Sequence, residues 1–194
     1  PPKPSSAASD VYKRQHRARN SLAVIQSVVR LTDAADPAAF RQAIHGRIEA
    51  MARAQAALAK SQWRGGTIGE VVRDELLSSV TAASRVRLSG AEIPLPADHV
   101  QPLSMVLHEL ATNATKYGAL SVREGVIDVR WASTSEGWSL DWQERGGPPA
   151  APPSRTGFGS RLMNSLARQL NGKLEFDWGA DGLSVTLTSG RPKP

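Results

Sequence analysis

The 194-residue sequence contains no cysteine, and only 5% of its residues are aromatic. The absence of cysteine excludes a disulfide-stabilised fold, a thiol nucleophile and thiolate metal sites. The four histidines are scattered without metal-ligand spacing, which argues against a zinc enzyme. No run approaches 18 apolar residues, and no signal-peptide pattern opens the chain. We therefore expect a soluble, cytoplasmic protein with no membrane segment.

Positive charge is concentrated near the start of the chain. Residues 1–65 carry 11 Lys and Arg against 4 Asp and Glu, whereas the rest of the chain is nearly neutral. A basic protein invites a nucleic-acid interpretation. Here, however, the basic residues follow helical patterns and lack the interleaved aromatic side chains of single-strand binders. We expect no nucleic-acid partner, and an acidic protein partner would suit the same charge.

Composition divides the chain into three parts. Residues 1–11 are rich in proline, serine and alanine and show no core pattern, so we expect a disordered or artefactual tail. Residues 12–62 have helical periodicity throughout. Residues 67–190 mix helical and strand patterns, and the glycine-containing sequence SQWRGG separates the two regions. The pattern predicts a helical hairpin followed by a second domain.

The hairpin is predicted to contain two helices. The first spans about residues 12–31, and the apolar residues that indicate it are Leu22, Ile25, Val28 and Val29. Asp36 can cap the second helix, Pro37 can take its first position, and the helical pattern continues to about Lys60. A lone hairpin of this length cannot bury its apolar stripe. We therefore expect a homodimer in which two hairpins form a four-helix bundle.

The second domain combines helices with alternating segments. Thr67 and Glu70 fit a capping box, and a long helix is predicted over residues 98–117. Alternation of apolar and polar residues predicts strands at residues 126–131 and 138–143 and a hairpin at the C-terminal end. This order of elements predicts an α+β sandwich with helices on one face of the sheet.

The predicted helix 98–117 carries one narrow polar stripe. At ~100° per residue, Asn113 and Lys116 lie within ~40° of Glu109. The apolar residues form a separate face that we expect to be buried, and they are Val100, Leu103, Leu107, Leu110, Ala114 and Tyr117. Amide and carboxylate oxygens suit magnesium, and a lysine suits the phosphates that such a cation bridges. A solvated helix face without a ligand is the simpler alternative.

Glycine-rich segments follow the predicted strands. Glu144 ends a strand and precedes RGGPP, which contains Gly146, and Gly157 and Gly159 flank the predicted start of the next helix. Glycines at a helix N-terminus expose backbone N–H groups to an anion, and the loop between these segments is long enough to cover a ligand. A lone GxG also fits an ordinary turn. Together with the polar helix, the set is much more specific for a ligand site.

Four segments resemble the HWE histidine kinases, a family of bacterial sensor kinases. Three resemble its nucleotide-binding boxes, and the fourth resembles its phosphoacceptor segment: HELATNATKYGALS (108–121), WQERGGPP (142–149), GFGSRL (157–162) and HRARNSLAVIQSVVRLT (16–32). The family name derives from a His and a Trp-x-Glu, here His108, Trp142 and Glu144. The resemblance implies an antiparallel phosphoacceptor hairpin followed by a Bergerat-type ATP-binding domain.

Residue roles follow from the resemblance position by position. His16 would be the phosphorylated histidine, on the first helix of the hairpin. Asn113 would ligate Mg²⁺, and Glu109 would support the metal site or handle protons. Lys116 would meet phosphate oxygens.

The remaining carried-over positions surround the base and phosphates of ATP. Tyr117 would lie near the nucleotide, although the helical count places it toward the core. Glu144 would accept the adenine amino group, in a position where most sensor kinases have Asp. Gly146, Gly157 and Gly159 would form the glycine boxes.

The implied activity is ATP-dependent autophosphorylation of His16, followed by transfer to an aspartate of a response-regulator receiver domain. The residue that deprotonates His16 stays unassigned. One alternative is a phosphotransfer or scaffold protein with the same dimeric hairpin and an inactive ATP domain, although the Asn and GxG that such a protein should lose are intact. A serine kinase or anti-sigma factor of the same fold would need no phosphoacceptor hairpin, and a DNA-binding regulator is the most remote option.

Overall fold

The computed structural model describes residues 22, 24–26, 28–30, 32, 36–79, 83–152 and 158–190. Its helices are α2 (Pro37–Lys60), α3 (Ile68–Ser79), α4 (Ala97–Lys116) and α5 (Phe158–Gln169), with 3-10 turns at Ala83–Arg85 and Ala119–Ser121. Its strands are β1 (Gly66–Thr67), β2 (Val86–Gly90), β3 (Pro94–Leu95), β4 (Val126–Ser133), β5 (Gly137–Arg145), β6 (Gly172–Gly179) and β7 (Gly182–Gly190).

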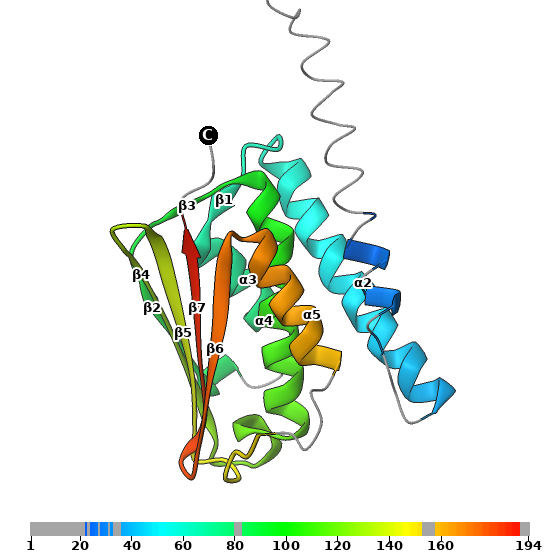
Figure 1. Cartoon of the computed structure of the whole chain (residues 1–194), viewed down its shortest axis with the longest axis vertical. Coiled ribbons are helices and arrows are strands. Elements are labelled where there is room, and N and C mark those ends of the chain that lie inside the picture. Colours follow the sequence, from blue (N-terminus) through cyan, green and yellow to red (C-terminus); the bar gives the residue numbers. More distant parts are fainter. Residues whose placement is uncertain are drawn as a thin grey trace, which may run out of the picture.

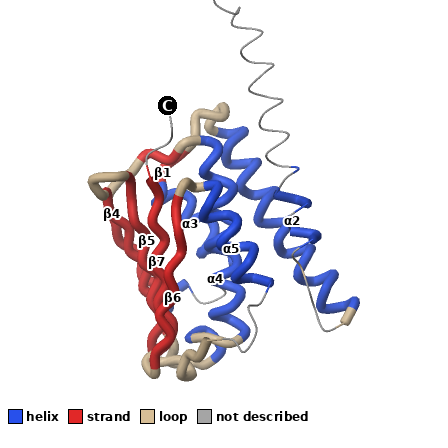
Figure 2. The backbone as a smooth tube through the Cα atoms, viewed as in Figure 1, coloured by secondary structure: helices blue, strands red, loops and turns tan. Residues whose placement is uncertain are grey.

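The molecule is built in layers (Figures 1 and 2). A five-stranded sheet of order β2-β4-β5-β7-β6 forms one layer; β2 and β4 are parallel, and the other neighbours are antiparallel. Helices α3, α4 and α5 cover one face of this sheet, and α2 lies beyond them. The predicted α+β sandwich with helices on one face is confirmed.

Capping chemistry sets the start of two helices. The side chain of Asp36 accepts hydrogen bonds from the backbone N–H groups of Ala38 and Ala39, and α2 begins at Pro37 as predicted. The Glu70 carboxylate accepts from the Thr67 backbone N–H at 2.7 Å, and the Glu70 backbone N–H donates to the Thr67 hydroxyl at 3.2 Å. This reciprocal pair is the predicted capping box of α3.

The first hairpin helix divides its apolar side chains between two faces. The described residues between 22 and 30 are helical, and Val24 and Val28 are buried within the chain. Leu22, Ile25 and Val29 are instead 57%, 40% and 52% exposed. The single stripe predicted from Leu22, Ile25, Val28 and Val29 is therefore wrong, because only Val28 of the four packs inward. Residues 12–21 of this predicted helix lie outside the described residues.

Helix α4 forms the centre of the core. It contacts α2, α3 and α5, and the apolar face predicted for it is buried from Val100 to Ala114. Tyr117 is the exception at 75% exposure, because the helix ends at Lys116 and the backbone of Tyr117 leaves the helical conformation. The prediction that Tyr117 points toward the core is wrong. In the described part of the chain, every helix is too short or too polar to cross a lipid bilayer.

Candidate functional site

A cavity of about 460 Å³ opens between the C-terminal half of α4, the start of α5 and the sheet. Four predicted site residues line it: Asn113, Tyr117, Glu144 and Gly159. Most of the other lining residues are apolar or glycine, and Pro148–Ala151 from the segment after β5 form part of the wall. A largely apolar cavity with a few converging polar groups is the usual form of a small-molecule site.

Glu144 is held firmly at the end of β5. Its side chain is only 3% exposed. The backbone N–H of Ala119 donates to Oε2 at 2.7 Å, and the indole N–H of Trp142 donates to Oε1 at 3.1 Å. Burial raises the pKa of Glu144 above its ordinary value, and the two hydrogen bonds act in the opposite direction. The result is a fixed carboxyl group with acceptor capacity left for a ligand.

Gly118 makes room for this carboxyl group. A Cβ at Gly118 would overlap Oε2 of Glu144, so any larger residue there would displace it. Gly118 also lines the cavity. Gly118 was not among the predicted site residues, although its place directly after the polar helix was an available signal.

The polar stripe of α4 meets the start of α5. A Cβ built on Gly159 would lie 3.5 Å from Oε2 of Glu109 and 4.0 Å from Nδ2 of Asn113. Asn113 is half-buried, whereas Glu109 is 4% exposed. The structure therefore brings together three residues that the sequence predicted to act together, from two helices about 50 residues apart.

Glu109 is already paired. Nε and one terminal nitrogen of Arg47, on α2, lie 2.6 Å from its two carboxylate oxygens. Arg47 is itself only 8% exposed. This bidentate ion pair links α2 to α4, the helix that supplies Leu110 and Asn113 to the cavity lining, and it was not predicted from the sequence.

Three predicted residues lie outside the cavity lining, and Glu109, described above, is one of them. Lys116 is exposed to solvent one residue before Tyr117. Gly146 occupies the left-handed region, with φ of +69°, where the chain leaves β5. The predicted site residues His16 and Gly157 lie outside the described residues.

An aromatic pair on β6 completes the wall. The rings of Phe176 and Trp178 are stacked, with centroids 5.9 Å apart, and both line the cavity. A flat π-surface of this kind suits a planar ring. The alternating sequence KLEFDW predicted the strand. It did not predict which face of the strand lines the cavity, because that depends on how the sheet packs.

The donor atoms fit a cation that arrives with phosphates. Among the described residues, no group of three or more His, Cys, Asp and Glu side chains is placed to hold a metal ion. Asn113 and Glu109 nevertheless place an amide and a carboxylate side by side. Mg²⁺ commonly takes only one or two protein oxygen ligands and completes its shell with water and substrate phosphates.

Comparison with known proteins gives the family. The sequence profile described as HWE histidine kinase matches residues 14–92. A blue-light-activated histidine kinase of Rhizobium johnstonii is 38% identical over 175 residues, which is 89% of this chain and 50% of that protein. A blue-light-activated histidine kinase of Brucella ovis is 37% identical over 181 residues, or 89% of this chain and 37% of that protein.

The chain belongs to the HWE histidine kinase family. It spans half or less of the length of these relatives. Solved structures agree on the fold: the blue-light activated histidine kinase EL346 of Erythrobacter litoralis has a TM-score of 0.69 at 19% identity, covering 97% of this chain and 61% of that one. The histidine kinase AdeS of Acinetobacter baumannii has a TM-score of 0.51 at 15% identity, covering 91% of this chain and 98% of that one. The predicted hairpin and Bergerat-type sandwich are confirmed as a fold.

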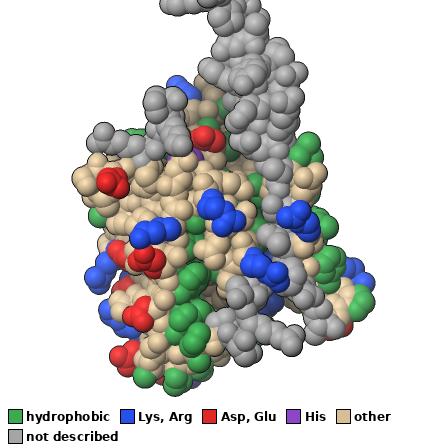
Figure 3. Space-filling model, viewed as in Figure 1, with side chains coloured by type: hydrophobic (Ala, Val, Ile, Leu, Met, Phe, Trp, Pro, Cys, Tyr) green, Lys and Arg blue, Asp and Glu red, His purple; other side chains and the backbone are tan. Residues whose placement is uncertain are grey.

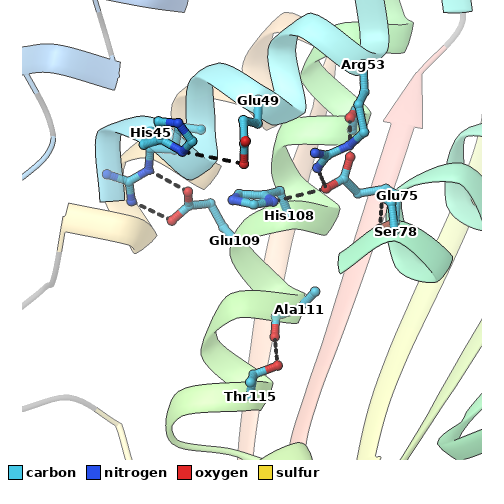
Figure 4. A network of polar contacts seen from close by, with 11 residues as sticks. His45, Glu49, Arg53, Glu75, Ser78, His108, Glu109, Ala111 and Thr115 are labelled. Atoms are coloured by element: carbon cyan, nitrogen blue, oxygen red, sulfur yellow. Dashed lines mark hydrogen bonds and ion pairs between the residues drawn. The ribbon is translucent and has the colours of Figure 1, made fainter. Parts of the chain in front are cut away.

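The His that gives the HWE family its first letter serves a contact between helices (Figure 4). Nδ1 of His108 lies 3.0 Å from Oε1 of Glu75, which is 2% exposed on α3. The same carboxylate accepts from Arg53 of α2 and from Ser104 of α4, both at 2.8 Å. His108 thus belongs to a polar cluster that joins α2, α3 and α4, whereas Trp142 and Glu144 meet at the cavity.

Proposed function

We propose that this chain is the kinase core of a two-component sensor, with a phosphoacceptor hairpin at residues 12–62 and an ATP-binding domain at 67–190. The observation that carries the proposal is the convergence of Asn113, Glu144 and Gly159 on one cavity. These residues come from three segments that resemble the three nucleotide boxes of HWE kinases. The relatives named above are themselves histidine kinases.

The buried end of the cavity suits adenine. Glu144 would accept the exocyclic amino group of the base, because Ala119 and Trp142 already fix the orientation of its carboxyl group. Phe176 and Trp178 offer an aromatic surface beside it. Tyr117 lines the same space.

The phosphates would lie toward the start of α5. Backbone N–H groups of its first turn are unpaired within the helix and attract anions, and Gly157 and Gly159 would let the phosphates approach closely. Asn113 would hold Mg²⁺, which neutralises phosphate charge when bound, with Glu109 in support. Lys116 would reach phosphate oxygens from the exposed end of α4, and Gly146 would allow the covering loop to turn away from β5.

The proposed reaction is phosphoryl transfer in two steps. A nitrogen of the His16 imidazole bonds to the γ-phosphorus of ATP while the bond to the bridging oxygen breaks, and ADP leaves. An aspartate of a response-regulator receiver domain then takes the phosphoryl group. Imidazole is largely neutral near pH 7 and therefore nucleophilic, so the protein contributes mainly position and charge.

The exposed apolar residues of the hairpin support a homodimer. Leu22, Ile25 and Val29 follow one another at helical spacing on the first helix, and all three are exposed in the single chain. Burying such a stripe against a second copy would remove it from water. On the face shown in Figure 3, several separate Lys and Arg side chains lie across the middle of the molecule, and most of the Asp and Glu side chains lie toward the side of the sheet.

Incubation with γ-labelled ATP and magnesium tests the proposal. The protein should take up label that is lost in acid and survives base, as phosphohistidine does. His16→Gln should abolish the label, whereas His45→Gln, a change at an exposed histidine of α2, should leave it intact. Acid-stable label, or label that persists in His16→Gln, would show that His16 is not the phosphoacceptor.

A further inference from the structure

Arg47, on the hairpin helix α2, has its charged guanidinium buried in the interior of the chain. Its guanidinium donates to both oxygens of Glu109 at 2.6 Å and to the hydroxyl of Thr32 at 2.5 Å. All three residues are more than nine-tenths buried. A buried guanidinium must stay paired with an anion, because leaving the charge buried without a partner is strongly destabilising.

Glu109 lies next to the place proposed for the phosphates of the nucleotide. Its Oε2 is close to Gly159 in the first turn of α5 and to Asn113, and both of these residues line the cavity. The sequence of that turn, Phe-Gly-Ser-Arg, contains no carboxylate of its own. The Glu109 carboxylate therefore occupies the surroundings of a helix N-terminus, which favour an anion.

A triphosphate that entered this region would meet like charge. Glu109 and the phosphates would repel each other unless a cation lay between them. If Glu109 turned to that cation, Arg47 would lose its partner. The guanidinium fork that fits a carboxylate with two parallel hydrogen bonds fits a phosphate equally well.

We propose that Arg47 is a phosphate-binding residue that the hairpin contributes to the nucleotide site. In the nucleotide-free protein it donates to Glu109, and when ATP binds it exchanges this carboxylate for phosphate oxygens. The inference rests on the proposed function. If it is correct, residues of both the hairpin and the sandwich domain form the nucleotide site.

The packing around α2 keeps Arg47 close to the site. Ala50, Met51, Ala54 and Leu58 bury one side of α2 in the common core. A Cβ on Gly46 would lie 3.3 Å from Nε2 of His108, so helices α2 and α4 approach closely one residue before Arg47. With the helix fixed in this way, Arg47 stays beside Glu109, and a new partner must take the place of that carboxylate.

Calorimetric titration of the full chain with ATP, ADP and AMP, each with magnesium, tests the exchange. Arg47→Gln should weaken ATP binding about ten- to hundredfold, which corresponds to the loss of hydrogen bonds to a charged group. ADP binding should weaken less, and AMP binding should stay within about twofold. Arg47→Lys retains the positive charge but lacks the two parallel N–H donors of the guanidinium. It should give a smaller loss of affinity, again largest for ATP and smallest for AMP.

Arg53→Gln is the matched control. Arg53 lies on the same helix and donates to Glu75 of α3 at 2.8 Å, whereas Glu109, the partner of Arg47, is the carboxylate close to Gly159. Arg53→Gln should change affinity for the three nucleotides by one common factor, if at all. Tighter ATP binding by Arg47→Gln, or equal losses for ATP and AMP, would overturn the inference. If the unsubstituted protein binds none of the three nucleotides, the proposed function itself fails.

Discussion

Trp142 and Glu144 are joined by a hydrogen bond within one strand: the indole nitrogen lies 3.1 Å from Oε1 of the carboxyl group. Residues two apart on a strand point to the same face, so the pair can meet without distorting β5. The backbone N–H of Ala119 holds the other oxygen at 2.7 Å. The Trp-x-Glu spacing therefore fixes the direction of the carboxyl group at the cavity.

The raised pKa of Glu144 predicts a pH-dependent stability difference. Because burial favours the protonated form, the folded state binds more protons than the unfolded state between the ordinary glutamate pKa, about 4.3, and the raised value. Stability from this group is thus lost as pH rises through that window. Glu144→Gln cannot ionise, so its free energy of unfolding relative to the unsubstituted protein should increase with pH there.

Urea unfolding of both proteins at several pH values from 4 to 8 measures this difference. Gln places an amide against one of the two N–H donors, so the variant should be less stable at the lowest pH. The decisive quantity is the slope of the difference in unfolding free energy against pH. A difference that is constant across the range would show that Glu144 has its ordinary pKa, and Asp141→Asn, an exposed change on the same strand, provides the matched control.

Gly118→Ala should damage the site through Glu144. The added Cβ would overlap Oε2, so the carboxyl group must leave the N–H of Ala119 or the backbone must shift. We expect a stability loss of about 1–3 kcal/mol, as for overpacking, together with weaker ATP binding. Thermal unfolding and calorimetry measure the two effects.

Gly179→Ala is the control for this change. The nearest atom to its Cβ would be 3.6 Å away, and its φ is not in the left-handed region. It should leave both quantities nearly unchanged. Normal stability and ATP affinity in Gly118→Ala would mean that Glu144 does not depend on this close approach.

Local chemistry made much of the fold predictable. Asp36 and Pro37 fixed the start of α2 because a cap and a proline act on adjacent backbone groups. The polar stripe of α4 was readable because helical spacing alone places Glu109 near Asn113. Both predictions depend on residues within about one turn of each other.

Contacts between distant segments were not predictable in this way. Arg47 and Glu109 are 62 residues apart, and their meeting depends on how α2 packs on α4. Tyr117 was misplaced because the 100° count assumes a helix that continues, whereas α4 ends one residue earlier. One apolar stripe was predicted for the first hairpin helix, whereas its apolar residues divide between two faces. The apolar pattern alone does not distinguish a face that packs inside the chain from a face that packs against a second copy.

The exposed stripe of the hairpin predicts that a charge there prevents the proposed dimer from forming. Ile25 lies between Leu22 and Val29 and is 40% exposed in the single chain, so Ile25→Glu should not disturb the chain's own core. Light scattering after size exclusion should give twice the chain mass for the unsubstituted protein and the chain mass for the variant. Val122→Glu, at a valine of similar exposure outside the hairpin, should remain dimeric. If the unsubstituted protein is already a monomer, the stripe does not pack against a second copy and the proposed homodimer is wrong.

Asn113→Ala separates metal binding from base binding. The amide lies close to Gly159 and Oε2 of Glu109, whereas the carboxyl group of Glu144, which would hold the base, lies against Gly118 and Ala119. Removing it should weaken ATP binding about tenfold or more when magnesium is present, and phosphohistidine formation should be abolished. With EDTA in place of magnesium, the variant and the unsubstituted protein should bind ATP equally. Asn164→Ala, a change on α5 outside the cavity lining, should match the unsubstituted protein under both conditions. An equal loss with and without magnesium would assign Asn113 to the nucleotide itself, since a ligand of the cation has no effect once the cation is removed.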